Sequence, residues 1–141
     1  MGRSAALAKP AIFAGLSDSG ATLVDCLGKI LGKPEEAVRL AAYDLVCELG
    51  KTKWGATEVC ARKDFVRSVA NPRSELVPRV AAGRYRSVCA LYTTCSALAE
   101  EGRAEDAAAV GIVGPAIPTL RDSVKAGPHG SGVSIVGTEA T

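Results

Sequence analysis

Residues 11–22, AIFAGLSDSGAT, are the part of the chain closest to a nucleotide-binding motif. Gly15 and Gly20 have the spacing of the two glycines in a phosphate-binding P-loop, and Thr22 holds the place of the hydroxyl that ligates Mg²⁺. The position before Thr22 needs a lysine to reach the β- and γ-phosphates, and Ala21 stands there instead. The segment therefore predicts a helix start after a glycine turn, and a degenerate P-loop-like nucleotide-binding protein remains an alternative.

Other acid–base groups lack the neighbours that catalysis needs. The only histidine, His129, lies in the sequence GPHGS with no nucleophile and no orienting acid beside it. Adjacent acids stand at expected helix ends, where carboxylates complement the helix dipole; these pairs are Glu35/Glu36, Glu100/Glu101 and Glu105/Asp106. A glycosidase-like carboxylate pair is the alternative. We expect no enzyme activity, no catalytic residue, no metal site and no cofactor.

Five cysteines are the remaining reactive groups: Cys26, Cys47, Cys60, Cys89 and Cys95. Their number is odd, and no two of them have the C-x-x-C spacing of a zinc or redox motif. We expect free thiols that act as small apolar core residues. Reduced thiols favour a reducing compartment, either the cytoplasm or the nucleus.

Composition narrows the class of protein. The 141 residues are 48% hydrophobic and 23% charged, which is typical of a globular chain. A net charge of +2 gives no electrostatic reason to expect nucleic-acid binding. No apolar run approaches the roughly 20 residues that span a bilayer, so no membrane association is expected.

Apolar residues recur at helical spacing along most of the chain, and the predicted fold class is all-α. Expected helices cover residues 20–31, 34–50, 54–60, 64–70, 76–100, 104–110 and 115–125. They form a single domain over residues 1–125. Residues 126–141 change to Gly, Ser and Thr and are expected to form a tail, with a short extended segment at 133–136.

Basic residues gather in two regions. Lys51, Lys53, Arg62, Lys63 and Arg67 form the first, and Arg79, Arg84 and Arg86 form the second. We interpret both as solvated helix faces. A groove for an acidic partner or for RNA phosphates is the alternative.

Residues 35–72 resemble one armadillo repeat. The first helix of such a repeat has the pattern seen in Ala41, Ala42, Leu45 and Leu49, and the last helix matches Phe65, Val66 and Val69. A looser second copy has Leu91, Cys95 and Leu98 in its first helix, and Ile117, Leu120 and Val124 in its last. The resemblance implies a short armadillo/HEAT-like helical solenoid of about two repeats, with residues 20–31 as an N-terminal capping helix.

Three segments, VRLAAYDLVCELGKTKWG, DFVRSVAN and LRDSVKAGP, also occur in an order similar to the C-terminal part of the proteasome non-ATPase regulatory subunit 5 family. Members of that family are armadillo/HEAT chaperones of the proteasome base. The resemblance implies a non-catalytic protein-binding scaffold or assembly chaperone whose partner is a proteasomal ATPase subunit. A structural subunit of a large multiprotein or ribonucleoprotein assembly is the alternative.

In armadillo units the last helix of each repeat lines the concave face. The residues expected to face a partner there are Asp64, Arg67, Ser68, Asn71, Arg121 and Lys125. Long cationic side chains on such a wall suit a protein partner with an acidic surface or tail.

The missing lysine gives a direct test of the nucleotide alternative. We expect no binding of ATP or GTP at micromolar concentration in isothermal titration calorimetry, because Ala21 offers no cation to the phosphates. Nucleotide binding that is lost on Gly20→Val would show that the P-loop interpretation is correct.

Overall fold

The helical periodicity of the sequence is realised in a computed structural model that describes residues 22–129. No strand occurs among the described residues, so the expected all-helical class is confirmed there. The helices are α2 (Leu23–Leu31), α3 (Glu36–Gly50), α4 (Lys53–Cys60), α5 (Lys63–Ala70), α6 (Pro78–Glu101), α7 (Ala107–Val113) and α8 (Ile117–Ala126), with 3₁₀ turns η1 (Ala104–Asp106) and η2 (Gly114–Ala116). The P-loop-like glycines and the expected extended segment at 133–136 lie outside the described residues.

Local chemistry sets the helix boundaries, which fall within three residues of those expected. Thr22 caps α2, because its Oγ1 accepts a hydrogen bond of 3.1 Å from the amide of Asp25. Thr52 caps α4 in the same way through the amide of Gly55, at 3.0 Å. Gly102 ends α6 in the left-handed conformation, with φ 57°.

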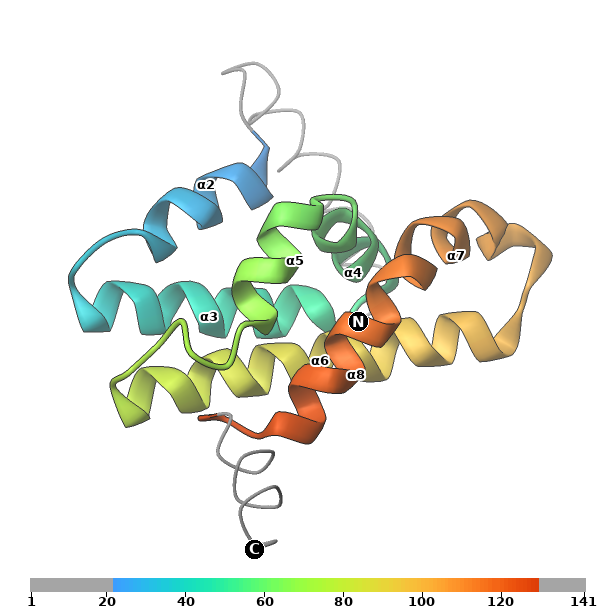
Figure 1. Cartoon of the computed structure of the whole chain (residues 1–141). Coiled ribbons are helices and arrows are strands. Elements are labelled where there is room, and N and C mark those ends of the chain that lie inside the picture. The colour runs from blue at the N-terminus through green and yellow to red at the C-terminus, as the bar shows by residue number, and fades with distance from the viewer. Residues whose placement is uncertain (1–21, 130–141) are drawn as a thin grey trace, which may run out of the picture.

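The long helix α6 is the centre of the fold. It packs against α3, α4, α5, α7 and α8, and it runs beside α3 in the same direction (Figure 1). The two helices approach closely at glycines: a Cβ on Gly83 would lie 2.6 Å from Cδ1 of Leu40. Buried aliphatic side chains from these helices fill the core, among them Val46, Val59, Val69, Val80, Val88, Leu91, Leu98, Val113 and Leu120.

The described helices after α2 form two successive groups of three. Each helix of the first group packs against the corresponding helix of the second. Residues 36–70 contribute α3, α4 and α5, and residues 78–126 contribute α6, α7 and α8. Within this arrangement α3 contacts α6, α4 contacts α7 and α5 contacts α8. Helix α2 adds to the N-terminal side by packing on α3 (Figure 1).

The second basic region differs from the expectation of a wholly solvated face. Arg79 and Arg86 are exposed and form ion pairs with acids of α3. Arg84 is completely buried. The interpretation of this residue as part of a solvated face was wrong. Its position on α6 directs the side chain toward the C-terminal ends of α5 and α8.

Carbonyl groups from two helix ends surround the Arg84 guanidinium. Its Nη1 donates to the carbonyl oxygen of Val69 at 2.8 Å and to Oγ of Ser123 at 3.3 Å. Its Nη2 donates to the carbonyl oxygens of Pro128 at 3.0 Å and Gly127 at 3.5 Å. Burial lowers the pKa of Arg84, yet an arginine stays protonated at neutral pH. The partial negative charge at the C-terminal ends of α5 and α8 therefore compensates a buried cation.

Replacing this guanidinium is expected to destabilise the fold. Arg84→Met leaves the carbonyls at the ends of α5 and α8 without a donor, which should lower the free energy of unfolding by about 2–4 kcal/mol. The matched change Arg86→Met, in an exposed pair with Asp44, should cost less than about 0.5 kcal/mol. Urea denaturation followed by circular dichroism measures both, and equal losses would contradict the role given to Arg84.

Candidate functional site

Helix α5 has one buried apolar face and one exposed charged face. Phe65, Val66 and Val69 are buried, as their spacing predicts. Arg67 and Asp64 are exposed, with 71% and 96% of their side-chain surfaces open to solvent. The helix therefore presents a charged ridge whose position is fixed by its buried side.

A groove of about 870 Å³ lies between α2 and α5, and we call it the α2–α5 groove. Its lining residues come from α2, from the turn before α5 and from α5 itself: Val24, Asp25, Gly28, Lys29, Ala61, Arg62, Lys63, Asp64, Phe65 and Arg67. Four cations and two carboxylates leave it with an excess of two positive charges. Buried Val24 and Phe65 supply an apolar floor.

Ion pairs inside the groove use only part of its positive charge. Arg62 contacts Asp25 at 3.3 Å, and Arg67 contacts Asp64 on the same helix. No carboxylate of residues 22–129 pairs with Lys29 or Lys63. The acids of the described residues therefore leave these two ammonium groups unpaired.

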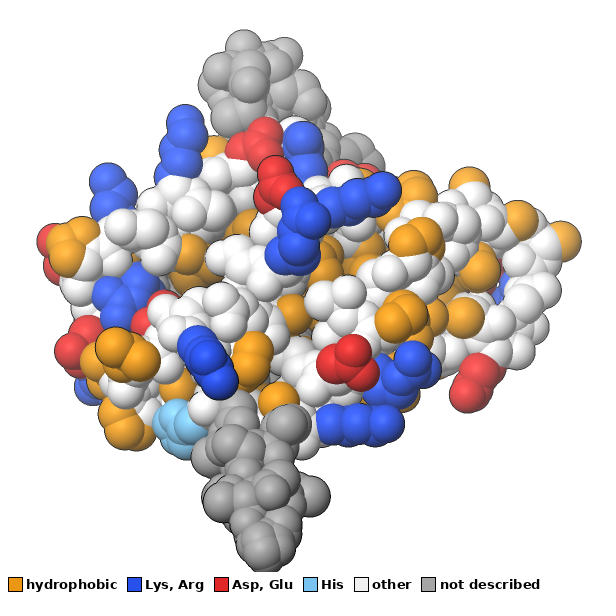
Figure 2. Space-filling model, viewed as in Figure 1, with side chains coloured by type: hydrophobic (Ala, Val, Ile, Leu, Met, Phe, Trp, Pro, Cys, Tyr) orange, Lys and Arg blue, Asp and Glu red, His pale blue; other side chains and the backbone are white. Residues whose placement is uncertain are grey.

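Two smaller hollows lie on the other side of α5. The α5–α8 groove, of about 390 Å³, is lined by Arg67, Ala70, Asn71, Pro72, Thr119, Asp122, Ser123 and Ala126. The α5–α7 hollow, of about 240 Å³, is lined by Cys60, Lys63, Val66, Arg67, Ile112, Pro115, Ala116 and Thr119. Arg67 lines all three depressions and so stands at the centre of this face. Figure 2 shows basic and acidic side chains gathered over the N-terminal end of α5.

The structure brings some of the predicted partner-facing residues together. Asp64 and Arg67 line the α2–α5 groove, and Arg67 and Asn71 line the α5–α8 groove. Ser68 is exposed on α5 without lining these depressions. Arg121 and Lys125 are exposed on α8, and they line none of the three.

Sequence reasoning missed Lys29 as a member of this surface. Arg62 and Lys63 are near Arg67 in the sequence, and their clustering was visible there. Lys29 lies more than thirty residues earlier, and only the packing of α2 beside α5 brings it into the groove. No local signal predicts that neighbourhood.

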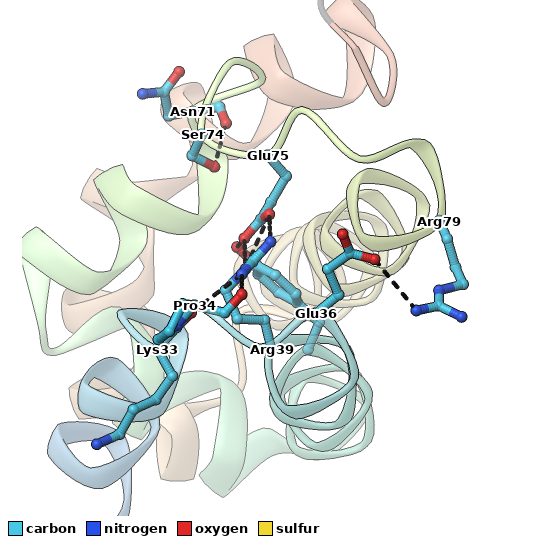
Figure 3. A network of polar contacts seen from close by, with 9 residues as sticks. Lys33, Pro34, Glu36, Arg39, Asn71, Ser74, Glu75 and Arg79 are labelled. Atoms are coloured by element: carbon cyan, nitrogen blue, oxygen red, sulfur yellow. Dashed lines mark hydrogen bonds and ion pairs between the residues drawn. The ribbon is translucent and has the colours of Figure 1, made fainter.

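A buried polar network fixes the loop that joins α5 to α6 (Figure 3). Glu75 is 6% exposed, and its carboxylate accepts hydrogen bonds from Nε and Nη2 of Arg39, at 3.0 Å, and from the hydroxyl of Tyr43, also at 3.0 Å. Nη1 of Arg39 donates to the carbonyl oxygens of Lys33 and Pro34. The network holds the loop on α3.

This network raises the pKa values of two of its members, Arg39 and Tyr43. The hydrogen bond to Glu75 raises the pKa of Arg39. Burial, followed by the charge of Glu75, raises the pKa of the Tyr43 hydroxyl. Both groups therefore keep their protons over the neutral pH range.

All five cysteines are free thiols in the structure, but the expectation that they are core residues holds for only two of them. Cys60 and Cys95 are buried, while Cys26, Cys47 and Cys89 are half-buried. The Sγ atoms of Cys60 and Cys95 lie 3.5 Å apart. This contact, together with burial, raises the pKa of the Cys60 thiol.

Two of the acid–base residues singled out in the sequence lie at the surface of the described region. His129 is exposed at the end of the described region, and Glu36 forms an exposed ion pair with Arg79. Within residues 22–129, no three His, Cys, Asp or Glu side chains are placed to hold a metal ion. No helix in the same region has both the length and the apolar character needed to cross a bilayer.

Comparison with known proteins gives no assignment: no family model, no curated protein and no solved structure matches this chain. The chemistry of the α5 face is therefore the ground on which a function can be proposed.

The buried network at Glu75 is expected to stabilise the fold, and substitution of its carboxylate tests this. Glu75→Gln removes the negative charge beside a largely buried Arg39 and should lower the free energy of unfolding by about 1–3 kcal/mol. Glu36→Gln, in an exposed ion pair with Arg79, should change it by less than about 0.5 kcal/mol. Chemical denaturation of the two variants provides the comparison, and a neutral Glu75→Gln would mean that the loop is held by other contacts.

Proposed function

We propose that this chain is a non-catalytic protein-binding scaffold that holds an acidic segment of a partner protein in the α2–α5 groove. The observation that carries the proposal is the lining of this groove: four cations around an apolar floor, with two ammonium groups left unpaired by the described acids. Complementary charge steers such a partner to the groove and sets its register.

The mixture of groups in the groove favours a peptide over a nucleic acid. Asp25 and Asp64 repel carboxylates and phosphates alike, but they can accept hydrogen bonds from the backbone amides of a peptide, and a nucleic-acid backbone has no such donors. The apolar floor at Val24 and Phe65 suits side chains such as leucine. A segment that combines Glu or Asp with aliphatic residues therefore fits both parts of the groove, with apolar contact in the centre and charges at the rim.

We further propose that the two helix triplets are armadillo/HEAT-like repeats and that α2 acts as their N-terminal cap. The contacts of α3 with α6, α4 with α7 and α5 with α8 support this, because repeat units are stabilised by stacking on their neighbours. In that arrangement α5 and α8 are the last helices of the two units. The more specific role of an assembly chaperone of the proteasome-base type rests on the sequence resemblance.

An ordered C-terminal tail would favour the alternative of a structural subunit in a larger assembly. Residues 130–141 lie outside the described part of the chain, so this feature favours neither alternative. The charged groove supports the scaffold proposal, because Lys29 and Lys63 pair with no acid of residues 22–129 and so offer a site for a separate acidic partner.

Binding of a defined acidic peptide tests the proposal. The probe is a fluorescein-labelled peptide of alternating Glu and Leu, followed by fluorescence anisotropy. Lys63→Gln together with Arg67→Gln should weaken binding by about 1–3 kcal/mol, or roughly five- to 150-fold, because both cations line the groove. Higher salt should also weaken binding by the wild-type chain.

The matched control is Arg121→Gln with Lys125→Gln, which removes the same charge from exposed positions that line none of the depressions. This variant should bind the peptide nearly as well as the wild-type chain. Equal losses in the two variants would place the contact elsewhere, and tighter binding of a single-stranded RNA of similar length would favour a phosphate ligand.

A further inference from the structure

We propose that Cys60 and Cys95 form a thiol–disulfide site that is oxidised by a small anionic disulfide such as glutathione disulfide. The two Sγ atoms are 3.5 Å apart, and a disulfide bond requires about 2.05 Å. Cys60 ends α4 and Cys95 lies within α6, so the packing of these helices holds the pair in contact. This inference is independent of the proposed protein-binding function.

Access to the pair comes through the α5–α7 hollow. Buried thiols are ordinarily unreactive, and Cys60 is only 4% exposed. Cys60 nevertheless lines this hollow, whereas Cys95 does not. Cys60 is therefore the member of the pair that lies nearer to an incoming disulfide.

The chemistry of the hollow selects the charge of the reagent. Lys63 and Arg67 stand at its lining, and no Asp or Glu is among its lining residues. Val66 and Ile112 add apolar contact. A disulfide that carries carboxylates is attracted to this environment, whereas a neutral one gains nothing from the two cations.

The reaction has two exchange steps. Because the pKa of Cys60 is raised, only a small fraction of its thiol is ionised and the first exchange is slow. The Cys60 thiol loses its proton, and its thiolate attacks one sulfur of the external disulfide, so that a mixed disulfide forms and one thiolate leaves. The Cys95 thiolate, formed by loss of its proton, then attacks the Cys60 sulfur and releases the second external thiolate. The two cysteines are oxidised by two electrons, the external disulfide is reduced to two thiols, and the leaving thiolates take up the two protons.

The other three cysteines lack such a partner. Sγ of Cys47 is 3.7 Å from the carbonyl oxygen of Arg86, and no sulfur–sulfur contact other than that of Cys60 with Cys95 occurs among the described residues. Reaction at Cys26, Cys47 or Cys89 should therefore stop at a mixed disulfide. The products of the two kinds of cysteine differ in mass and can be separated.

Oxidation of the reduced, folded full-length chain with glutathione disulfide tests the site. Intact-mass measurement should show loss of two hydrogens, and non-reducing peptide mapping should find a Cys60–Cys95 cross-link. Cys95→Ser should stop the reaction as a glutathione adduct on Cys60. Absence of the cross-link in the folded wild-type chain, or a cross-link between other cysteines, would overturn the proposal.

The role of charge is tested by comparing two reagents. Lys63→Gln with Arg67→Gln should slow cross-linking by glutathione disulfide at least severalfold and leave cross-linking by the neutral 2-hydroxyethyl disulfide unchanged. An equal rate change with both reagents would show that the cations do not select the reagent. The peptide-binding experiment has a separate readout, so failure of one proposal leaves the other intact.

Discussion

The arrangement of α5 and α8 on the central helix depends on one buried cation. Arg84 reaches from α6 to the carbonyl of Val69 in the last turn of α5, and to the carbonyls of Gly127 and Pro128 beyond the end of α8. No carboxylate forms an ion pair with it within the described residues. Helix ends supply the compensating negative charge, so the cation is stable only where both ends converge.

This constraint has consequences for the surface. Arg84 holds the C-terminal end of α5 on α6. In this position α5 buries Phe65, Val66 and Val69, and it exposes Lys63 and Arg67 to solvent. The Arg39–Glu75 pair fixes the following loop against α3. The buried polar groups that stabilise the fold therefore also determine where the depressions beside α5 lie and which charges line them.

The sequence predicted the helices better than their contacts. Helical spacing identified α3 and α5 and the burial of Phe65, Val66 and Val69, because apolar periodicity reflects the side that must leave water. Within the armadillo-like pattern, Ala42 and Leu49 are buried but Ala41 and Leu45 are exposed, since the spacing does not reveal how broad the covered face is.

Charged residues were the least predictable, because tertiary packing decides their environment. An arginine on a long helix is ordinarily solvated, and nothing near Arg84 in the sequence indicates that two helix ends will surround it. Lys29 joined the groove only through the packing of α2 beside α5.

The central claim is that the α2–α5 groove binds an acidic segment, and hydrogen exchange of the chain with and without the Glu–Leu peptide tests it most directly. The account predicts slower exchange over residues 24–29 and 61–67 and no change over 121–125; protection confined to 121–125 would contradict it.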